Sequence, residues 1–157
     1  MTKTPALTRD IGRAERAMRA LLEGLLDGAG LSFCEWTVLV FLDGAGPLAR
    51  GELVRRQVDG RVAAEAEARA AVDGLLSRGL LAPNERARGA GGPYGDSGAP
   101  RLAPTAAGEA AYRPVRRVVS RVTDELFSGL PEADLEATRR TLEEVARRAD
   151  ARLTVGG

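Results

Sequence analysis

Side chains able to do covalent or acid–base chemistry are scarce in this chain. Histidine is absent, so the usual general base and the usual nitrogen ligand of a metal ion are missing. The sequence contains no Gly-x-Ser-x-Gly motif, no phosphate-binding Gly-rich loop motif and no Cys-x-x-Cys. Carboxylates such as Glu143 and Glu144 stand near arginines at helical spacing, which predicts charge pairs on a solvated helix face. We therefore expect a protein that is not an enzyme and that has no metal site and no cofactor.

Cys34 is the one candidate for redox chemistry. It is the only cysteine, which excludes an intramolecular disulfide. It falls within the first turn of an expected helix, where the helix dipole can lower the pKa of a thiol. The alternative, which we favour, is that Cys34 is a small buried hydrophobic residue.

Arginine supplies nearly all of the positive charge. The 157 residues include 23 basic and 22 acidic ones, and Lys3 is the only lysine. A guanidinium suits bidentate contacts to phosphate or guanine, although a GC-rich genome would enrich arginine by itself. The net charge of +1 excludes a strongly basic protein that coats nucleic acid. Any DNA binding must therefore come from the local placement of arginines, helped by doubling in a dimer.

The elements that would position these arginines lie between residues 49 and 81. Two helical patterns are separated by Asp59-Gly60, residue types that tolerate turn geometry. The second pattern ends at Gly79, because glycine adopts a left-handed helix end at no cost, and residues 80–83 continue as a short strand. The apolar face of this second helix comprises Ala64, Ala68, Ala71, Val72, Leu75 and Gly79.

A Gly-rich segment, residues 85–100, follows the strand. Residues 101–103 return as a second strand, and Thr105 is a suitable cap for a long helix. A helix pair, a hairpin and a return into a helix predict a winged helix-turn-helix. The alternative is a helix pair of an ordinary small bundle, and the order of the elements favours the wing.

Further helices flank this region. A helical stripe begins at Leu7, and Ser32 with Glu35 forms a capping box for a second helix. We expect residues 38–42 of that helix to be buried on most sides, because they are apolar all round. Residues 48–49 are expected to form a small extra strand beside the wing.

Five stretches carry a resemblance to a known family: residues 31–39 (LSFCEWTVL), 51–54 (GELV), 72–80 (VDGLLSRGL), 104–108 (PTAAG) and 130–135 (LPEADL). Together, in this order, they resemble the MarR family of bacterial transcriptional regulators. The chain departs from the family in its long wing, which lacks the usual Asp-x-Arg. It also has Ala70 at the family's common arginine, and Glu65 and Glu67 where serine or threonine is usual.

The resemblance implies a mainly α protein with a small β-hairpin wing. Residues 1–157 would form a single MarR-like domain, with dimerisation helices at 7–28 and 105–150. Residues 31–104 would form the winged helix-turn-helix lobe, with the wing loop at 85–100. The narrow apolar stripe of the last helix also suits packing on another protomer.

The function implied is that of a homodimeric, sequence-specific DNA-binding regulator. It would act as a repressor that a small aromatic or phenolic ligand releases from its double-stranded operator. One alternative is a MarR-like dimer that has lost DNA binding and serves as a ligand-binding or interaction module, because Glu65 and Glu67 repel phosphates. Another is a redox sensor acting through Cys34.

The expected DNA contacts are all arginines. Arg69 is the best candidate to read a base, since arginine pairs with guanine in the major groove, and Arg61 could contact a base or a phosphate. Phosphate contacts from the preceding helix are assigned to Arg50, Arg55 and Arg56. Arginines beside a flexible hairpin tip suit the minor groove, and those flanking the wing loop are Arg86, Arg88 and Arg101.

Trp36, the only tryptophan, has two interpretations. The first is core packing; the second, implied by the resemblance, is a wall of a ligand pocket between the dimerisation helices and the DNA-binding lobe. No apolar run reaches about 18 residues, and the N-terminus carries no apolar signal core. A cytoplasmic protein without a membrane span is therefore expected.

Overall fold

The computed structural model describes residues 4–84 and 99–155. These fall into two compact units, residues 1–119 and residues 120–157. The first unit contains the elements α1 (Thr4–Asp27), α2 (Phe33–Ala45), β1 (Leu48–Ala49), α3 (Arg50–Asp59), α4 (Glu65–Ser77), β2 (Leu81–Pro83), β3 (Arg101–Pro104) and the start of α5 (Ala106–Phe127). The second unit contains the end of α5 and α6 (Glu132–Val155).

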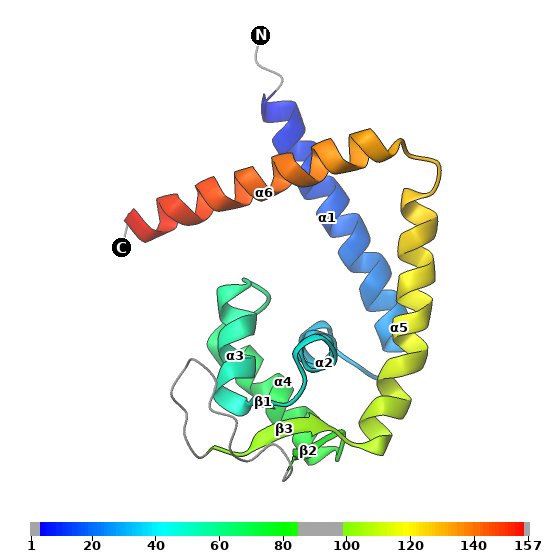
Figure 1. Cartoon of the computed structure of the whole chain (residues 1–157), viewed down its shortest axis with the longest axis vertical. Helices are drawn as coiled ribbons and strands as arrows, with labels where there is room; N and C mark the ends of the chain where they lie inside the picture. The colour runs from blue at the N-terminus through cyan, green and yellow to red at the C-terminus, as the bar shows by residue number, and fades with distance from the viewer. Residues whose placement is uncertain (1–3, 85–98, 156–157) are drawn as a thin grey trace. The chain divides into compact units, whose positions relative to one another are not determined.

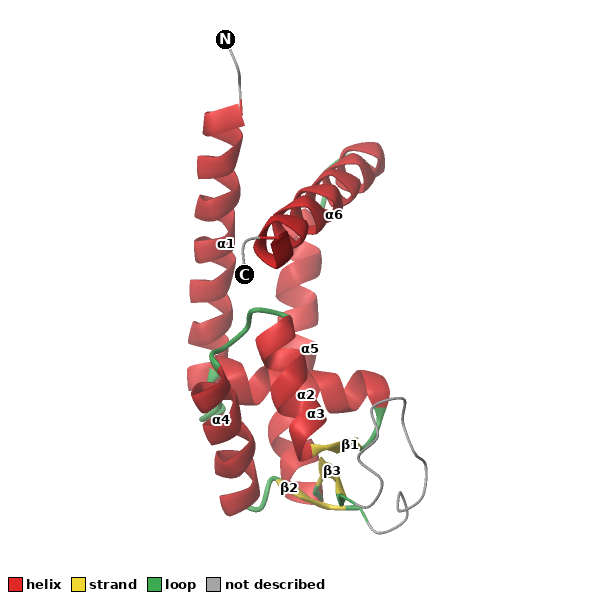
Figure 2. Cartoon of the chain, turned by 90° about the vertical axis from the view of Figure 1, so that its left-hand side faces the viewer, coloured by secondary structure: helices red, strands yellow, loops and turns green. Residues whose placement is uncertain are grey.

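The three short strands form one antiparallel sheet in the order β1-β3-β2 (Figure 1). Leu48 pairs with Leu102, and Leu81 pairs with Pro104. The sheet lies beside the start of α3 (Figure 2), which places the wing strands against the helix pair. The predicted extra strand at residues 48–49 and the two predicted hairpin strands are therefore confirmed.

The helix ends follow local signals in the sequence. The hydroxyl of Ser32 accepts a hydrogen bond from the Glu35 amide, and the Glu35 carboxylate accepts one from the Ser32 amide, so the predicted capping box is present. Gly79 has a φ of 67°, and the Leu80 amide donates to the Leu75 carbonyl at 2.9 Å, which closes α4 as predicted.

The core of the first unit brings together side chains from α1, α2, α3 and α4. Its largest fully buried members are Leu26, Val38, Leu39, Leu53, Gln57, Val72 and Leu75. Gln57 is the polar exception: its amide oxygen accepts from the Thr37 hydroxyl at 3.5 Å, while its Nε2 has no hydrogen-bond partner among the described residues. The core therefore fixes the angle between α3 and α4, the two helices of the predicted helix-turn-helix.

Three details differ from the sequence-based expectation. The first helix begins at Thr4, before the predicted start at Leu7. Val40, in the run expected to be buried on most sides, is 39% exposed, because the buried residues of α2 (Cys34, Trp36, Val38, Leu39 and Leu42) leave its face uncovered. The apolar face predicted for α4 is buried from Ala68 to Leu75, but its ends, Ala64 and Gly79, are exposed.

Candidate nucleic-acid interface

The outward face of α4 is the surface that a winged helix-turn-helix presents to DNA. Ala68, Ala71, Val72 and Leu75 face the core, so the exposed side of the helix carries Glu65, Arg69, Ala70 and Asp73. Residues 60–64 connect α3 to α4. Within this turn Arg61 has a φ of 55°, a left-handed conformation that is uncommon for a residue with a side chain. Arg61 is exposed at the N-terminal end of α4, as its predicted role requires.

Three of the predicted arginines lie around one hollow between α3 and α4. Arg50, Arg55 and Arg69 line it, and its volume is about 290 Å³. Carboxylates share the same place, since Asp59 and Glu65 also line it. The structure therefore brings the predicted phosphate contacts of α3 next to the predicted base contact of α4, and it surrounds them with negative charge.

Two of these arginines are held in ion pairs. Arg50 donates from Nε and Nη2 to the carboxylate of Asp73 at 2.9 and 2.7 Å, which raises the pKa of Arg50 and lowers that of Asp73. Arg69 donates to Glu65 one turn earlier on α4. All four side chains are more than a third exposed. Solvent-exposed pairs of this kind contribute about 0–1 kcal/mol, so a phosphate or a base can replace the carboxylate at low cost.

The remaining predicted DNA contacts are placed less favourably or lie outside the described part of the chain. Arg56 donates to Glu52 at 2.8 Å on α3, and it does not line the hollow. Arg101, on β3, donates to the Pro47 carbonyl at 3.1 Å and so braces the turn before β1. Arg86 and Arg88, in the predicted wing loop, fall outside the described residues.

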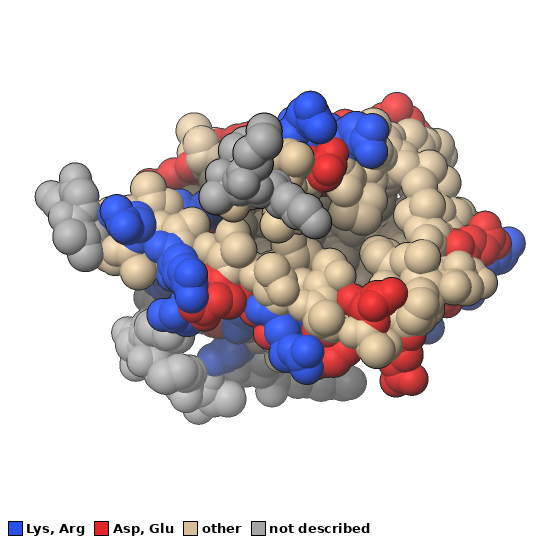
Figure 3. Space-filling view, turned by 90° about the horizontal axis from the view of Figure 1, so that it is seen from above, with Lys and Arg blue, Asp and Glu red and all other residues tan. Residues whose placement is uncertain are grey.

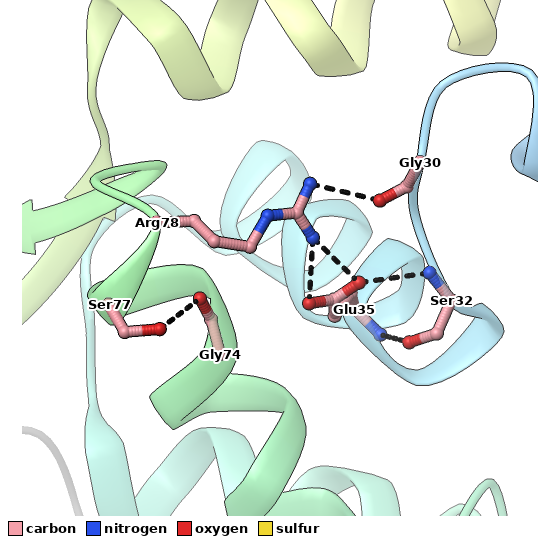
Figure 4. Close-up of polar contacts among 6 residues, drawn as sticks. All are labelled: Gly30, Ser32, Glu35, Gly74, Ser77 and Arg78. Carbon is pink, nitrogen blue, oxygen red and sulfur yellow. Dashed lines mark hydrogen bonds and ion pairs between the residues drawn. The ribbon is translucent and has the colours of Figure 1, made fainter.

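Arg78 makes a connection that the sequence did not predict (Figure 4). It caps α4 and donates from Nη1 to both oxygens of Glu35, at 3.1 and 3.2 Å, and from Nη2 to the Gly30 carbonyl at 2.9 Å. Glu35 already closes the capping box of α2 through Ser32. One guanidinium therefore ties the end of α4 to the start of α2 and to the turn after α1.

A second connection joins α2 to α5. The phenol of Tyr112 donates to Asp43 Oδ2 at 3.1 Å, and Arg116 Nε lies 2.9 Å from the same oxygen. Burial and the Asp43 charge raise the pKa of Tyr112 to about 12, so the phenol stays protonated at neutral pH. The ring of Tyr112 also packs against Trp36, with 5.0 Å between ring centroids.

Trp36 is thus a core residue, only 6% exposed. This agrees with the first of its two interpretations, and its role as a wall of a ligand pocket stays a prediction. Cys34 is also buried, and its thiol donates to Glu67 Oε1 at 3.4 Å. Burial and Glu67 raise the pKa of Cys34 to about 11. Burial, and then the α4 carboxylate, outweigh any lowering by the helix dipole, so the structure agrees with the interpretation we favoured, that of a small buried residue.

Charges of both signs are interspersed on the face that Figure 3 draws. Figure 3 shows arginines and carboxylates close to one another on one face, with uncharged areas between them. Among the described residues, no group of three or more histidine, cysteine or acidic side chains could hold a metal ion. In the same part of the chain, no helix is long and apolar enough to cross a membrane.

Comparisons with known proteins identify the fold. No protein-family model and no curated protein matches the sequence. Solved structures do match. MarR from Staphylococcus aureus in complex with salicylate and kanamycin has a TM-score of 0.73 and 15% identity, over 93% of this chain and 91% of that one.

Two further structures of MarR-family transcriptional regulators match. The one from Rhodococcus sp. RHA1 has a TM-score of 0.66 and 18% identity over 93% and 96% of the two chains. The one from Silicibacter pomeroyi has a TM-score of 0.64 and 23% identity over 86% and 84%. The predicted fold, a mainly α winged helix-turn-helix of the MarR type, is therefore confirmed.

Proposed function

We propose that this chain is a homodimeric transcriptional regulator that binds a pseudo-palindromic DNA operator through α4. The observation that carries the proposal is the hollow between α3 and α4, where Arg50, Arg55 and Arg69 meet beside the three-stranded wing sheet. In a winged helix-turn-helix this is the surface that enters the major groove. The pairing of Arg50 with Asp73 and of Arg69 with Glu65 makes binding selective, since only a well-placed phosphate or guanine replaces both carboxylates.

The distribution of exposed apolar side chains supports a dimer. Among the described residues, all the exposed large hydrophobic side chains but Val40 and Val58 belong to α1, α5, α6 or the turn between α5 and α6. The stripe on α6 includes Leu142 and Val145, which are 42% and 49% exposed. Apolar faces of this kind are covered by a partner in soluble proteins. A second copy of the chain is the occupant we propose, through the helices predicted for dimerisation.

We further propose that the regulator is a repressor that a small ligand releases from DNA. The hinge is α2, which Arg78 and Glu35 tie to α4, and which Tyr112 and Asp43 tie to α5. A ligand that prefers one spacing of the two reading helices must weaken binding to an operator that fixes another spacing. The complex of the S. aureus structure with salicylate supports a small aromatic ligand, and Trp36, against Tyr112, would report it by fluorescence.

The acidic start of α4 favours a second candidate. Glu65 and Glu67 lie in its first turn, where they repel phosphates. A dimer that has lost DNA binding and serves as a ligand-binding or interaction module would keep every other feature of the fold.

A DNA titration separates the two candidates. Fluorescence anisotropy would compare a duplex from upstream of the protein's own gene with a shuffled duplex of the same composition, at several salt concentrations. The regulator binds the natural duplex tighter by about 10³-fold or more, with affinity that falls as salt rises. Arg69→Ala reduces the preference, and Arg140→Ala, which replaces an exposed arginine of α6, leaves it unchanged. Equal affinity for both duplexes would favour the module without DNA binding.

A further inference from the structure

A pocket lies between α1, the start of α2 and the first turn of α4, away from the α3–α4 hollow. Its volume is about 460 Å³, within the range of small-molecule sites. Its walls comprise Arg19, Glu23, Asp27, Leu31, Ser32, Phe33, Cys34, Val62 and Glu67. Neither the proposed DNA contacts nor Trp36 are among these residues.

The charge of this pocket is unbalanced. Three of its lining residues are carboxylates, and no ion pair joins Glu23, Asp27 or Glu67 to a cation among the described residues. Arg19 is the one basic residue of the lining, and it is engaged elsewhere. Its guanidinium lies 4.1 Å from the centroid of the Phe33 ring, and its Nε is 3.6 Å from Glu15. The pocket therefore offers negative charge next to an aromatic surface.

A second, more apolar hollow adjoins the first. It has a volume of about 350 Å³ and is lined by Glu15, Met18, Arg19, Leu22, Phe33, Gly60, Arg61 and Val62. The two hollows share Arg19, Phe33 and Val62, so they adjoin at the Arg19–Phe33 stack. A ligand that bridges them meets carboxylates at one end and the apolar side chains of Leu22, Phe33 and Val62 at the other.

We propose that these two hollows together bind one amphipathic organic cation, an ammonium group joined to an aromatic or aliphatic body. The ammonium would lie among Glu23, Asp27 and Glu67, because a cation in a partly enclosed site needs a paired charge. The apolar body would lie against Leu22, Phe33 and Val62. The same carboxylates repel a phenolate or carboxylate ligand, so this inference, which rests on the proposed function, narrows the small aromatic or phenolic ligand first expected to a cationic one.

A ligand in this pocket would contact the helix-turn-helix directly, at the turn before α4 and at the first turn of α4. Val62 belongs to the turn that leads into α4, and Glu67 lies in the first turn of that helix. Glu67 accepts the hydrogen bond of the Cys34 thiol from α2. A cation that pairs with Glu67 therefore competes for a contact between α2 and α4, and this is how ligand binding would alter the position of α4.

The test compares three probes of matched size on the DNA-free protein by isothermal titration calorimetry at low salt. They are 2-phenylethylammonium, 2-phenylethanol and 3-phenylpropanoate, which differ in charge and share the phenyl ring. We expect the cation to bind at least tenfold tighter than the other two. An anion that binds as tightly as the cation, or a cation without measurable binding at millimolar concentration, would overturn the proposal. Since no DNA is present, the result does not depend on whether the protein binds an operator.

Variants with effects of opposite sign exclude a loss of folding as the explanation. Glu23→Gln with Asp27→Asn should weaken binding of 2-phenylethylammonium roughly tenfold, the effect of two exposed ion pairs at the upper end of their usual strength. Arg19→Gln removes the competing cation and should strengthen it roughly threefold. Glu132→Gln, in α6, is the matched control and should change nothing. Unchanged affinity in the double variant, or weaker binding after Arg19→Gln, would contradict the assignment.

Discussion

Gly108 marks the closest approach between α5 and the wing. Its Cα faces the backbone of Leu80, and a Cβ added there would lie 2.1 Å from the Leu80 carbonyl oxygen. The same oxygen accepts a hydrogen bond from the Thr105 amide at 3.0 Å, and the Thr105 hydroxyl caps the Gly108 amide at 3.1 Å. The start of α5 is thus fixed to the start of the wing by backbone contacts that leave no room for a side chain.

We predict that Gly108→Ala lowers the free energy of unfolding by about 3 kcal/mol. An ordinary contact begins near 3.4 Å, so the two segments must separate by more than 1 Å. Overpacking of this kind costs about 1–3 kcal/mol, and the weakened Thr105–Leu80 hydrogen bond adds about 0.5–1.5 kcal/mol. The better helix propensity of alanine offsets about 1 kcal/mol. Because the obstacle is a backbone carbonyl, which cannot rotate away, we place the net loss of unfolding free energy near the upper end of the range that these contributions allow.

Urea unfolding followed by circular dichroism measures this effect. Gly44→Ala, near the end of α2, is the matched control, since a Cβ there meets no atom within 4 Å. We expect that variant to be more stable by about 0.5–1 kcal/mol. If Gly108→Ala proved as stable as the native chain or more so, the close contact between α5 and the wing would be refuted.

Four further results are expected. Arg78→Gln should cost about 1–2 kcal/mol of unfolding free energy, because it breaks the bonds to Glu35 and a backbone carbonyl. Arg78→Lys should recover less than half of the lost unfolding free energy, since lysine lacks the forked guanidinium that donates to two partners at once. Equal stability in urea of the native chain and both variants would contradict this role of Arg78. Arg69→Ala should reduce discrimination between operator and shuffled DNA by about 1–3 kcal/mol in anisotropy titrations; unchanged discrimination would move the reading face elsewhere. Burial and Glu67 raise the pKa of the Cys34 thiol from 9.0 to about 11. At pH 7 the thiol of the folded protein should therefore react with iodoacetamide about 100-fold more slowly than that of the protein unfolded in urea. Equal rates in the two states would disprove the burial of Cys34 beside a carboxylate. From neutral pH to about pH 9 folding stability should change little, and it should fall as pH rises toward 11–12, because the folded state holds the protons of Cys34 and Tyr112 more tightly than the unfolded state. Urea midpoints that stay constant from pH 7 to pH 11 would contradict the raised pKa values.

Features set by neighbours along the chain could be predicted from the sequence. The capping box of Ser32 and Glu35, the stop at Gly79 and the cap at Thr105 each depend on residues at most five positions apart. Side chains at such spacing meet whatever the rest of the protein does. The order of these signals was sufficient to predict the winged helix-turn-helix.

The candidate site was harder to predict because its contacts join distant residues. Arg50 pairs with Asp73, 23 positions later, and Arg78 with Glu35, 43 positions earlier. Neither pair follows from helical spacing, since each depends on the angle at which two helices pack. The raised pKa of Cys34 has the same origin: the helix dipole is local, while the burial of the thiol and the carboxylate of Glu67 depend on how α4 packs against α2.

Hydroxyl-radical footprinting of the upstream DNA tests most directly whether two copies of α4 read an operator. Two protomers related by a twofold axis must protect two patches whose centres lie about 10–10.5 base pairs, or 34–36 Å, apart. We predict such a pair of patches, with weaker protection after Arg69→Ala and none at high salt. A single patch, a spacing that is not a multiple of one helical turn, or no protection anywhere in the upstream region at micromolar protein would contradict the proposed function.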